Sequence, residues 1–217
     1  MKRITLLVLG FAAAASVTYA APPMPPRKVE IIYQVIANGV PIAEVTQSLE
    51  HDGRNYRLTE NWKGKGAFAL KGNATRTSSG AVAADGLRPR QFEDKRAGRD
   101  PQQVTFDPAA KIPTLKQQDQ LSLLWSFAFA PPSKLAAVDV ADGKHVSHYV
   151  YQPAGKEKVM TPAGEFNTLK FIKKRETPDD KATELWLSAD KRIPVRLLVI
   201  EKNGTKLDQV AAKISTQ

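Results

Sequence analysis

Residues 29–62 read VEIIYQVIANGVPIAEVTQSLEHDGRNYRLTENW, and this stretch decides the fold class. Apolar side chains alternate with polar ones along three runs of this stretch. A period of two places every second side chain on the same face, as in a half-buried β-strand. Asn38-Gly39 and Asp52-Gly53 separate the runs, and such dipeptides tolerate the positive φ angles of tight hairpin turns. The stretch therefore predicts an antiparallel meander.

Turn dipeptides recur along the rest of the chain, with runs of strand length between them. They include Ser79-Gly80, Asp85-Gly86, Asp142-Gly143, Ala163-Gly164 and Asn203-Gly204. Further strands are expected at residues 183–188, 193–201 and 205–214. This spacing favours a mainly β fold, a single antiparallel meander sheet curved into a roll or partly open barrel. Because no interior linker is present, residues 29–217 are predicted to form one β-rich domain.

One segment departs from the strand pattern. Residues 119–130 read DQLSLLWSFAFA, contain no Gly or Pro, begin at a candidate N-cap in Asp119 and stop before Pro131. The pattern predicts a helix of about three turns. Its side chains are apolar almost all round, so the sheet must enclose it, with Trp125 deepest.

The enclosed helix is expected either to plug the core or to border a ligand, and the plug is the simpler interpretation. If a hydrophobic or lipid-like ligand binds inside the curved sheet, the residues predicted to contact it share large apolar side chains. They are Trp62, Leu121, Leu124, Trp125, Phe127 and Phe129.

The first 20 residues are predicted to be a secretory signal peptide. Lys2 and Arg3 precede a short apolar run, and small residues lead to a cleavage point between Ala20 and Ala21. The proline-dense residues 21–28 are expected to form an extended tether. No later segment is apolar enough to span a membrane, so the chain after cleavage is not expected to be membrane-spanning.

Composition excludes several chemistries. The chain has 217 residues, 32 Lys+Arg against 22 Asp+Glu, a formal charge of +10 and no Cys. Disulfide scaffolds, thiol nucleophiles, thiolate metal sites and a lipidated N-terminal Cys are therefore excluded. Nucleic acid is a poor candidate partner, because aromatic residues make up only 7% of the chain and export removes the usual partner.

Basic residues concentrate between positions 54 and 76. An exported protein with such a face could contact an anionic envelope component, although charge of this size also serves ordinary solubility. The residues predicted to make this contact are Arg54, Arg57, Lys63, Lys65, Lys71 and Arg76. Lys63 to Gly66 is expected to form a hairpin or bulge rather than a phosphate loop.

Candidate catalytic and metal-ligating residues are few. His145 and His148 are three apart in a predicted strand and should point to opposite faces, and His51 adjoins a turn and should be solvated. No Gly-x-Ser-x-Gly motif is present. Glu184 and Asp190 have the spacing of a solvated face and a turn. The sequence therefore predicts no cofactor, no metal site and no catalytic residues.

Several short motifs occur in an order that resembles a known family. They are GLRP at residues 86–89, DQLS at 119–122, VMTPAGEFNTLK at 159–170, ELWLSAD at 184–190 and RIPVRL at 192–197. Their order and spacing resemble the exported bacterial family catalogued as domain of unknown function 3108, over nearly all of the chain. The resemblance implies a β-rich envelope protein, periplasmic in Gram-negative bacteria, with no established activity.

The motif residues also have structural interpretations of their own. Gly164 is expected in a hairpin turn, with Phe166, Leu169 and Phe171 as candidate core residues on the following strand. Pro194 should mark a strand start, an edge or a bulge, because proline cannot donate to a central ladder.

Three hypotheses for the function remain. The first is a non-catalytic periplasmic protein that binds a hydrophobic or lipid-like ligand in a curved sheet. The second is a structural or interaction module of cell-envelope maintenance whose core is entirely filled. The third is an enzyme acting on envelope polysaccharide.

Overall fold

One sheet dominates the structure, a computed structural model that describes residues 24–109, 112–177 and 180–217. Thirteen strands in these ranges form it, in the order β6-β5-β4-β3-β2-β1-β13-β12-β11-β10-β9-β8-β7. The strands are β1 Lys28–Ala37, β2 Val40–His51, β3 Asn55–Gly64, β4 Ala74–Ala83, β5 Gly86–Arg96, β6 Gln102–Thr105, β7 Gln118–Asp119, β8 Ala136–Ala141, β9 Val146–Thr161, β10 Gly164–Lys173, β11 Ala182–Ser188, β12 Pro194–Ile200 and β13 Lys206–Thr216.

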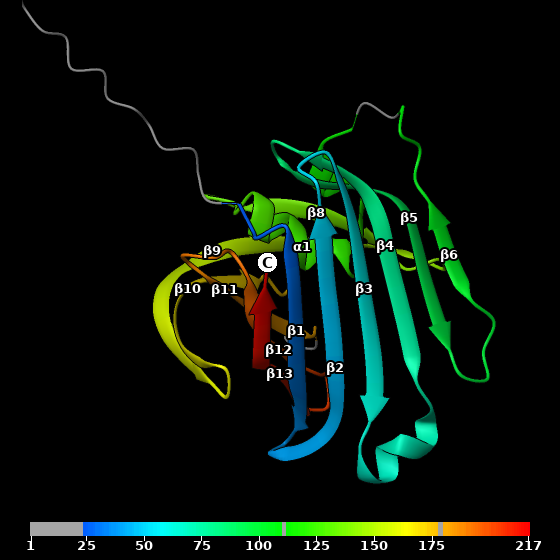
Figure 1. The fold of residues 1–217 in the computed structure, drawn as a ribbon, viewed down its shortest axis with the longest axis vertical. Coiled ribbons are helices and arrows are strands. Elements are labelled where there is room, and N and C mark those ends of the chain that lie inside the picture. The colour runs from blue at the N-terminus through cyan, green and yellow to red at the C-terminus, as the bar shows by residue number, and fades with distance from the viewer. Residues whose placement is uncertain (1–23, 110–111, 178–179) are drawn as a thin grey trace, which may run out of the picture.

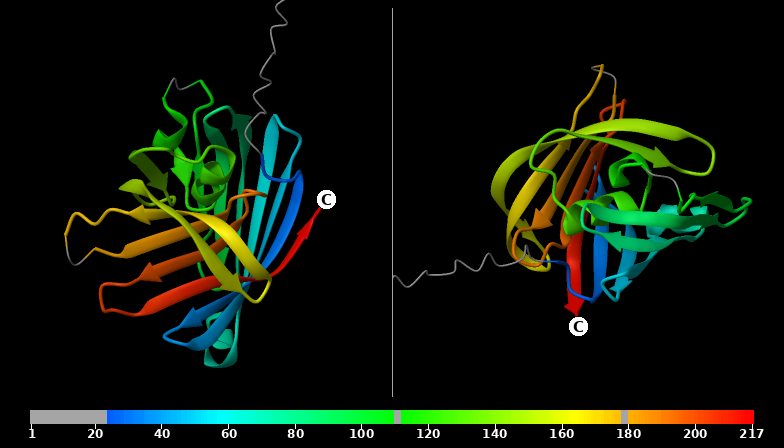
Figure 2. Two further views of the ribbon diagram at one scale, coloured as in Figure 1. Left: turned by 90° about the vertical axis from the view of Figure 1, so that its left-hand side faces the viewer. Right: turned by 90° about the horizontal axis from the view of Figure 1, so that it is seen from above.

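Twelve of the thirteen strands form two antiparallel meanders, β1 to β6 and β8 to β13, which join where β1 pairs with β13. Both meanders curve around a common interior and leave the sheet unclosed (Figures 1 and 2). The predicted mainly β fold, a curved sheet around one helix, is therefore confirmed.

The sheet is mixed, which corrects the prediction of a purely antiparallel one. β7 runs parallel to β8, with Gln118 opposite Val140 and Asp119 opposite Ala141. The single helix of the interior lies between these two strands in the chain. A helical crossover of this kind is what allows two consecutive strands to run in the same direction.

The predicted helix is present but shorter than residues 119–130. α1 spans Ser122–Phe129, because Asp119 belongs to β7 and lies ahead of the first helical turn. It packs inside the curved sheet against β5, β7 and β12 (Figure 1). Leu124 is its one half-buried residue and the other seven are buried, with Trp125 fully enclosed. Enclosure of the apolar helix is therefore confirmed.

Two short 3₁₀ helices, η1 Gly66–Lys71 and η2 Thr114–Lys116, complete the described elements. η1 stands in the connection from β3 to β4, where the sequence predicted a hairpin or bulge at residues 63–66. In the described part of the chain, no helix has the length and apolar character needed to cross a bilayer.

The GLRP motif at residues 86–89 allows α1 to pack closely against β5. Gly86 has φ of +122°, and a Cβ at this position would lie 2.2 Å from Ser126 Oγ in α1. The next backbone N–H, that of Leu87, donates to the same Oγ at 3.1 Å. The glycine is required here both by its backbone conformation and by the close approach of the helix.

The Pro-Ala-Gly turn between β9 and β10 has a structural role too. Its central backbone N–H, on Ala163, donates to the carbonyl of Ala211 in β13 at 3.1 Å. The β9–β10 turn thus binds the Ala211 carbonyl of β13.

β12 begins at Pro194, beside a register shift, and Tyr33 donates its hydroxyl hydrogen to the Pro194 carbonyl at 2.8 Å. The predicted strand start at Pro194 is confirmed.

The strand after this turn faces the core as predicted. Phe171 is buried, and Leu169 and Phe166 are half-buried against the core.

Predictions for the N-terminus fall mostly outside the described residues. The signal peptide and the cleavage point between Ala20 and Ala21 lie there entirely, as does the start of the predicted tether, residues 21–28. Within its described part Pro25 is buried, its carbonyl oxygen lies 3.1 Å from Nε2 of His51, and Lys28 already belongs to β1.

The expectation that His51 is solvated was wrong. The residue is half-buried, and its ring meets the Phe129 ring edge-on with centroids 5.0 Å apart. The turn beside His51 is exposed, but the helix end packs over the last residue of β2.

Candidate functional site

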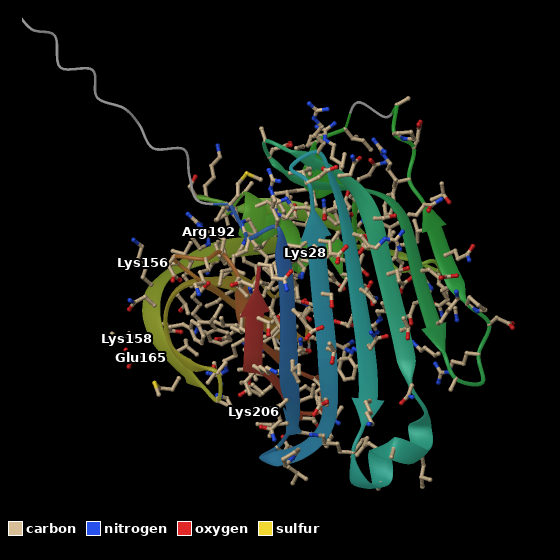
Figure 3. The ribbon with its side chains drawn as sticks, in the orientation of Figure 1. Lys28, Lys156, Lys158, Glu165, Arg192 and Lys206 are labelled. Atoms are coloured by element: carbon tan, nitrogen blue, oxygen red, sulfur yellow. The ribbon has the colours of Figure 1, made fainter. Side chains whose placement is uncertain are left out.

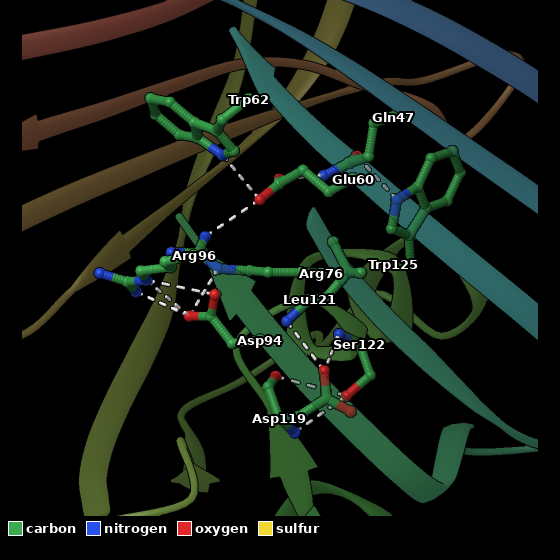
Figure 4. A network of polar contacts seen from close by, with 10 residues as sticks. All are labelled: Gln47, Glu60, Trp62, Arg76, Asp94, Arg96, Asp119, Leu121, Ser122 and Trp125. Carbon is green, nitrogen blue, oxygen red and sulfur yellow. Dashed lines mark hydrogen bonds and ion pairs between the residues drawn. The ribbon is translucent and has the colours of Figure 1, made fainter. Parts of the chain in front are cut away.

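Charged side chains from β3, β4 and β5 form a row on the inner face of the sheet (Figure 4). Glu60 shares the inward side of β3 with the buried Tyr56 and Leu58, since alternate residues of a strand face the same way. The strand register then sets Glu60 opposite Arg76 of β4, and Arg76 opposite Asp94 of β5. The inner face therefore carries a row of alternating charge.

These side chains pair closely. Arg76 donates to Glu60 Oε1 at 3.0 Å and to Asp94 Oδ2 at 3.2 Å, and Arg96 donates to Asp94 Oδ2 at 2.7 Å. The Glu60 and Asp94 side chains are 7% and 4% exposed, so the two arginines must stabilise their negative charges in place of water. Burial acts to raise the pKa of Asp94, but the hydrogen bond from Arg96 and the charges of Arg76 and Arg96 hold that pKa below its usual value.

The ion-pair row connects two tryptophans (Figure 4). Trp62 donates its indole N–H to Glu60 Oε1 at 2.8 Å, and Gln47 donates to Glu60 Oε2 at 2.9 Å. Trp125 of α1 donates to Gln47 Oε1 at 2.9 Å. One continuous network thus runs from the enclosed helix to Trp62, which is only half-buried.

A groove of about 270 Å³ lies at the Trp62 end of this network. β2, β3, β4, η1 and the end of β5 supply its walls. Its lining residues are Ile42, Ala43, Trp62, Gly64, Phe68, Gly72, Ala74, Arg76 and Arg96. The walls are thus mainly apolar, with two guanidinium groups at one side.

The local sequence explains why η1 forms one wall of the groove. Lys65 donates its backbone N–H to the Ile42 carbonyl at 2.8 Å, which fixes the start of η1 against β2. A Cβ on Gly64 would lie 2.3 Å from the Phe68 carbonyl oxygen, so the chain can fold back at this point only with glycine. The Gly64-Lys65-Gly66 stretch therefore places Phe68 over the groove.

The groove suits a molecule with an apolar part and an anionic group. Trp62, Phe68 and Ile42 offer apolar surface, and the Arg96 side chain is 39% exposed beside them. Arg96 Nε and Nη2 already donate to Asp94, and the remaining N–H groups of its guanidinium are the donors that an anionic group would meet.

A second buried polar cluster fixes the start of α1. Asp119 Oδ1 accepts from the backbone N–H groups of Leu121 and Ser122 at 2.9 and 2.7 Å, and Oδ2 accepts from Ser78 Oγ at 2.6 Å. Tyr56 Oη lies 3.0 Å from the same Ser78 oxygen. Burial raises the pKa of Asp119 to about 6. The N-cap of α1 is Leu121 and not Asp119 as predicted, and Asp119 holds the backbone there from two residues ahead. Because Asp119 is fully buried, the cluster offers no access to a substrate.

The residues predicted to contact an apolar ligand separate into two groups. Trp62 lines the groove. Leu121, Trp125, Phe127 and Phe129 are buried in the core, and Leu124 is half-buried against it.

The packing of Phe127 illustrates how the helix side chains are used. Its ring contacts the rings of Tyr151 and Phe171 with centroids 5.3 and 5.4 Å apart. The structure therefore brings the helix residues together as core side chains and places only Trp62 in the groove.

The six basic residues predicted to contact an anionic surface are dispersed over different parts of the fold. Arg57 and Lys63 are exposed on the outward side of β3, whereas Arg76 faces inward in the ion-pair row. Lys65 pairs with Glu44 at 3.1 Å. Arg54 lies in the exposed β2–β3 turn, and the side chain of Lys71 is outside the described part of the structure. The five whose side chains are described do not form one face.

Histidine and carboxylate candidates occur away from this site. His148 Nδ1 lies 2.7 Å from Asp139 Oδ1, and His145 precedes β9 in a turn. Glu184 pairs with Lys170 at 2.6 Å. Among the residues that the structure describes, no group of three His, Asp or Glu side chains could hold a metal ion.

Sequence reasoning missed Gln47, Glu60, Asp94, Arg96 and Phe68. A signal for the carboxylates was present, because Glu60 continues the inward alternation of Tyr56, Leu58 and Trp62, just as Asp94 continues that of Phe92. A charged residue in an inward run needs a buried partner.

The comparisons with known proteins concern the fold more than the site. A family model described as "Protein of unknown function (DUF3108)" matches residues 30–210. No curated protein matches the chain. A β-barrel-like protein of domain of unknown function DUF1849 from Brucella abortus is 8% identical, with a TM-score of 0.55, over 89% of this chain and 99% of that one. This likeness supports the open-barrel fold.

Two further solved structures share less of the geometry. A candidate lipoprotein from Parabacteroides distasonis is 11% identical with a TM-score of 0.40, over 89% of this chain and 97% of that one. A candidate exported protein with a YmcC-like fold from Bacteroides fragilis is 11% identical with a TM-score of 0.41, over 90% and 98%.

Proposed function

The chain belongs to the DUF3108 family of proteins of unknown function, and we propose that it is an exported, non-catalytic protein that binds an amphipathic, lipid-like molecule. The binding site is the groove between the lower ends of β2 to β4 and η1. The apolar part of the ligand lies against Trp62 and Phe68, and its anionic group meets the Arg96 side of the groove.

The observation that carries this proposal is the composition of the groove. Apolar walls and the Arg96 guanidinium, whose side chain is 39% exposed, meet in one hollow of about 270 Å³. Drug-sized ligands usually occupy pockets of about 300–1,000 Å³, so this hollow suits a single acyl chain or a similarly slender group. This site replaces the helix-facing one expected from the sequence, because the helix side chains are used in the core.

Binding is favoured over catalysis by how the nearby charges are used. Glu60 and Asp94 both form ion pairs with arginines, and Asp119 is fully buried at the start of α1. A general acid or base must lie within hydrogen-bond reach of the substrate atom that gains or loses the proton. Export to the periplasm is supported by Lys2, Arg3 and the apolar run that follows them, and N-terminal sequencing of protein from a periplasmic fraction tests it.

A titration with a fluorescent fatty-acid probe tests the groove. Trp62→Ala removes the largest apolar wall, and we expect it to weaken probe binding roughly tenfold, as expected for losing a large buried apolar contact. Leu70→Ala is the matched control, because Leu70 lies on η1 but is 92% exposed. Absence of probe binding to the wild type, or equal weakening in both variants, would contradict the proposal.

A second candidate function is the structural or interaction module with a filled core. The observation in its favour is that the space around α1 is occupied by the protein's own side chains, with Trp125 and Phe127 fully enclosed. If folded wild-type protein binds no probe, and no lipid is found by mass spectrometry after extraction, the module becomes the better account.

A further inference from the structure

Three connections of the first meander meet at one end of the molecule. Alternate turns of an up-and-down sheet lie at the same end, so the β1–β2, β3–β4 and β5–β6 connections converge there (Figure 1). The β3–β4 connection is the longest of the three and carries η1, which stands at the lowest point of the view.

Apolar side chains project from this end into solvent. Leu70 is 92% exposed and Phe68 is 38% exposed, both on η1, and Val40 at the start of β2 is 62% exposed. A short helix with two large apolar side chains facing water is an unfavourable surface for a protein that stays in solution.

Basic side chains flank these apolar ones. Lys63 and Lys65 precede η1 and are exposed, and Glu44 is the carboxylate that pairs with Lys65. Lys206 lies beside the β1–β2 turn, where its backbone N–H donates to Asn38 Oδ1 at 2.9 Å (Figure 3). We call Lys63, Lys65, Phe68 and Leu70 the η1 tip.

The β5–β6 turn at the same end adds the exposed Arg99 and Asp100, one of each charge. The basic side chains Lys63, Lys65, Lys206 and Arg99 outnumber the acidic Glu44 and Asp100. The end is therefore basic around an apolar protrusion.

We propose that the η1 tip docks on the surface of an anionic lipid bilayer. Leu70 enters the boundary between headgroups and acyl chains, and Lys63 and Lys65 contact anionic headgroups. Apolar insertion combined with basic residues is the usual mode of interfacial binding, and its strength rises with buried apolar area and with anionic lipid.

A lipid surface fits the geometry better than a protein groove does. The apolar side chains stand on a narrow, projecting turn with charges around them, whereas helix-in-groove recognition needs a longer amphipathic face than η1 provides. The inference goes beyond the proposed function and does not require the groove to be occupied. It would bring the mouth of the groove, which Phe68 also lines, to the bilayer.

Co-sedimentation with vesicles tests the docking surface. Wild-type protein should sediment with phosphatidylcholine vesicles that contain phosphatidylglycerol, and much less with phosphatidylcholine alone or in high salt. Leu70→Glu should reduce the bound fraction roughly tenfold, since it removes apolar area and adds a like charge. The matched control is Leu135→Glu, because Leu135 is 57% exposed but lies between α1 and β8.

The double variant Lys63→Gln/Lys65→Gln tests the charges separately. It should keep the fold and lose most of the difference between the two vesicle types. Absence of binding by the wild type, equal loss in the Leu70 and Leu135 variants, or an unchanged lipid preference in the double variant would each overturn the proposal.

A labelling experiment distinguishes a bilayer from a second copy of the chain. The sequence has no Cys, so Leu70→Cys and Leu135→Cys each offer a single site for an environment-sensitive dye. Emission should rise and shift to the blue at position 70 when vesicles are added, and stay constant at position 135. A change at position 70 that depends on protein concentration without vesicles would indicate self-association and overturn the bilayer proposal.

Discussion

Replacing the buried carboxyl group at the start of α1 should change how stability depends on pH. Asp119 accepts two backbone N–H groups and the Ser78 hydroxyl, with no exposure to solvent. Asp119→Asn keeps the shape, and its amide oxygen can accept the same two N–H groups while its NH₂ donates to Ser78 Oγ. The variant should therefore fold, with the ionisable group removed.

The size of the effect follows from the pKa of Asp119. Burial raises it from 3.8 to about 6, so between these values the folded protein holds a proton that the unfolded chain has lost. Stability contributed by the protonated group is therefore present below pH 4 and is lost as the pH rises through about 6. At about 1.4 kcal/mol for each pH unit, the loss amounts to about 3 kcal/mol.

Urea unfolding of both proteins between pH 4.5 and 7.5 measures this effect. Because the window starts above pH 3.8, the difference in unfolding free energy between wild type and Asp119→Asn should shift by about 2 kcal/mol in favour of the variant as the pH rises. Taking the difference cancels carboxylates such as Asp94, whose lowered pKa affects stability only at lower pH. A difference that stays constant across this range would refute the reasoning.

Three further substitutions probe the packing. Phe127→Ala should lower the unfolding free energy by about 3–5 kcal/mol and leave probe binding by the folded protein unchanged, because its ring packs against the core and away from the groove; loss of probe binding in folded protein would contradict this. Gly86→Ala should destabilise by more than about 2 kcal/mol in thermal unfolding, since φ is +122° and the added methyl would meet Ser126, and a neutral result would show that the helix can shift. Tyr33→Phe should cost about 1–2 kcal/mol in urea unfolding by removing the hydrogen bond to the buried Pro194 carbonyl, and an unchanged midpoint would argue against that bond.

Most of the fold could be predicted because local chemistry specifies it. Asn38-Gly39 takes positive φ angles of 47° and 88°, as a tight hairpin turn requires, and the flanking alternation sets which side of each strand faces the core. The helix, apolar almost all round, had to be enclosed wherever it lay. β7 could not be predicted, since a two-residue strand carries no periodic signal and depends on tertiary pairing with β8.

The candidate site could be predicted only in part, because it depends on register. Trp62 could be identified from its large side chain. The role of its partner Glu60 could not, because it depends on the strand register that sets Arg76 opposite Glu60 and Asp94 opposite Arg76. The sequence favours a core role for the helix residues but leaves a ligand contact open, because the rings that cover their apolar surface, such as Tyr151, come from distant strands.

Photolabelling tests most directly whether the groove binds an amphipathic molecule. The protein is irradiated with a fatty acid that carries a diazirine near the end of its chain, digested and mapped by mass spectrometry. We expect saturable labelling within residues 62–74, competed by unlabelled fatty acid and strongly reduced in Trp62→Ala. Labelling of residues 122–129 instead, or labelling that neither saturates nor responds to the substitution, would contradict a ligand site in the groove.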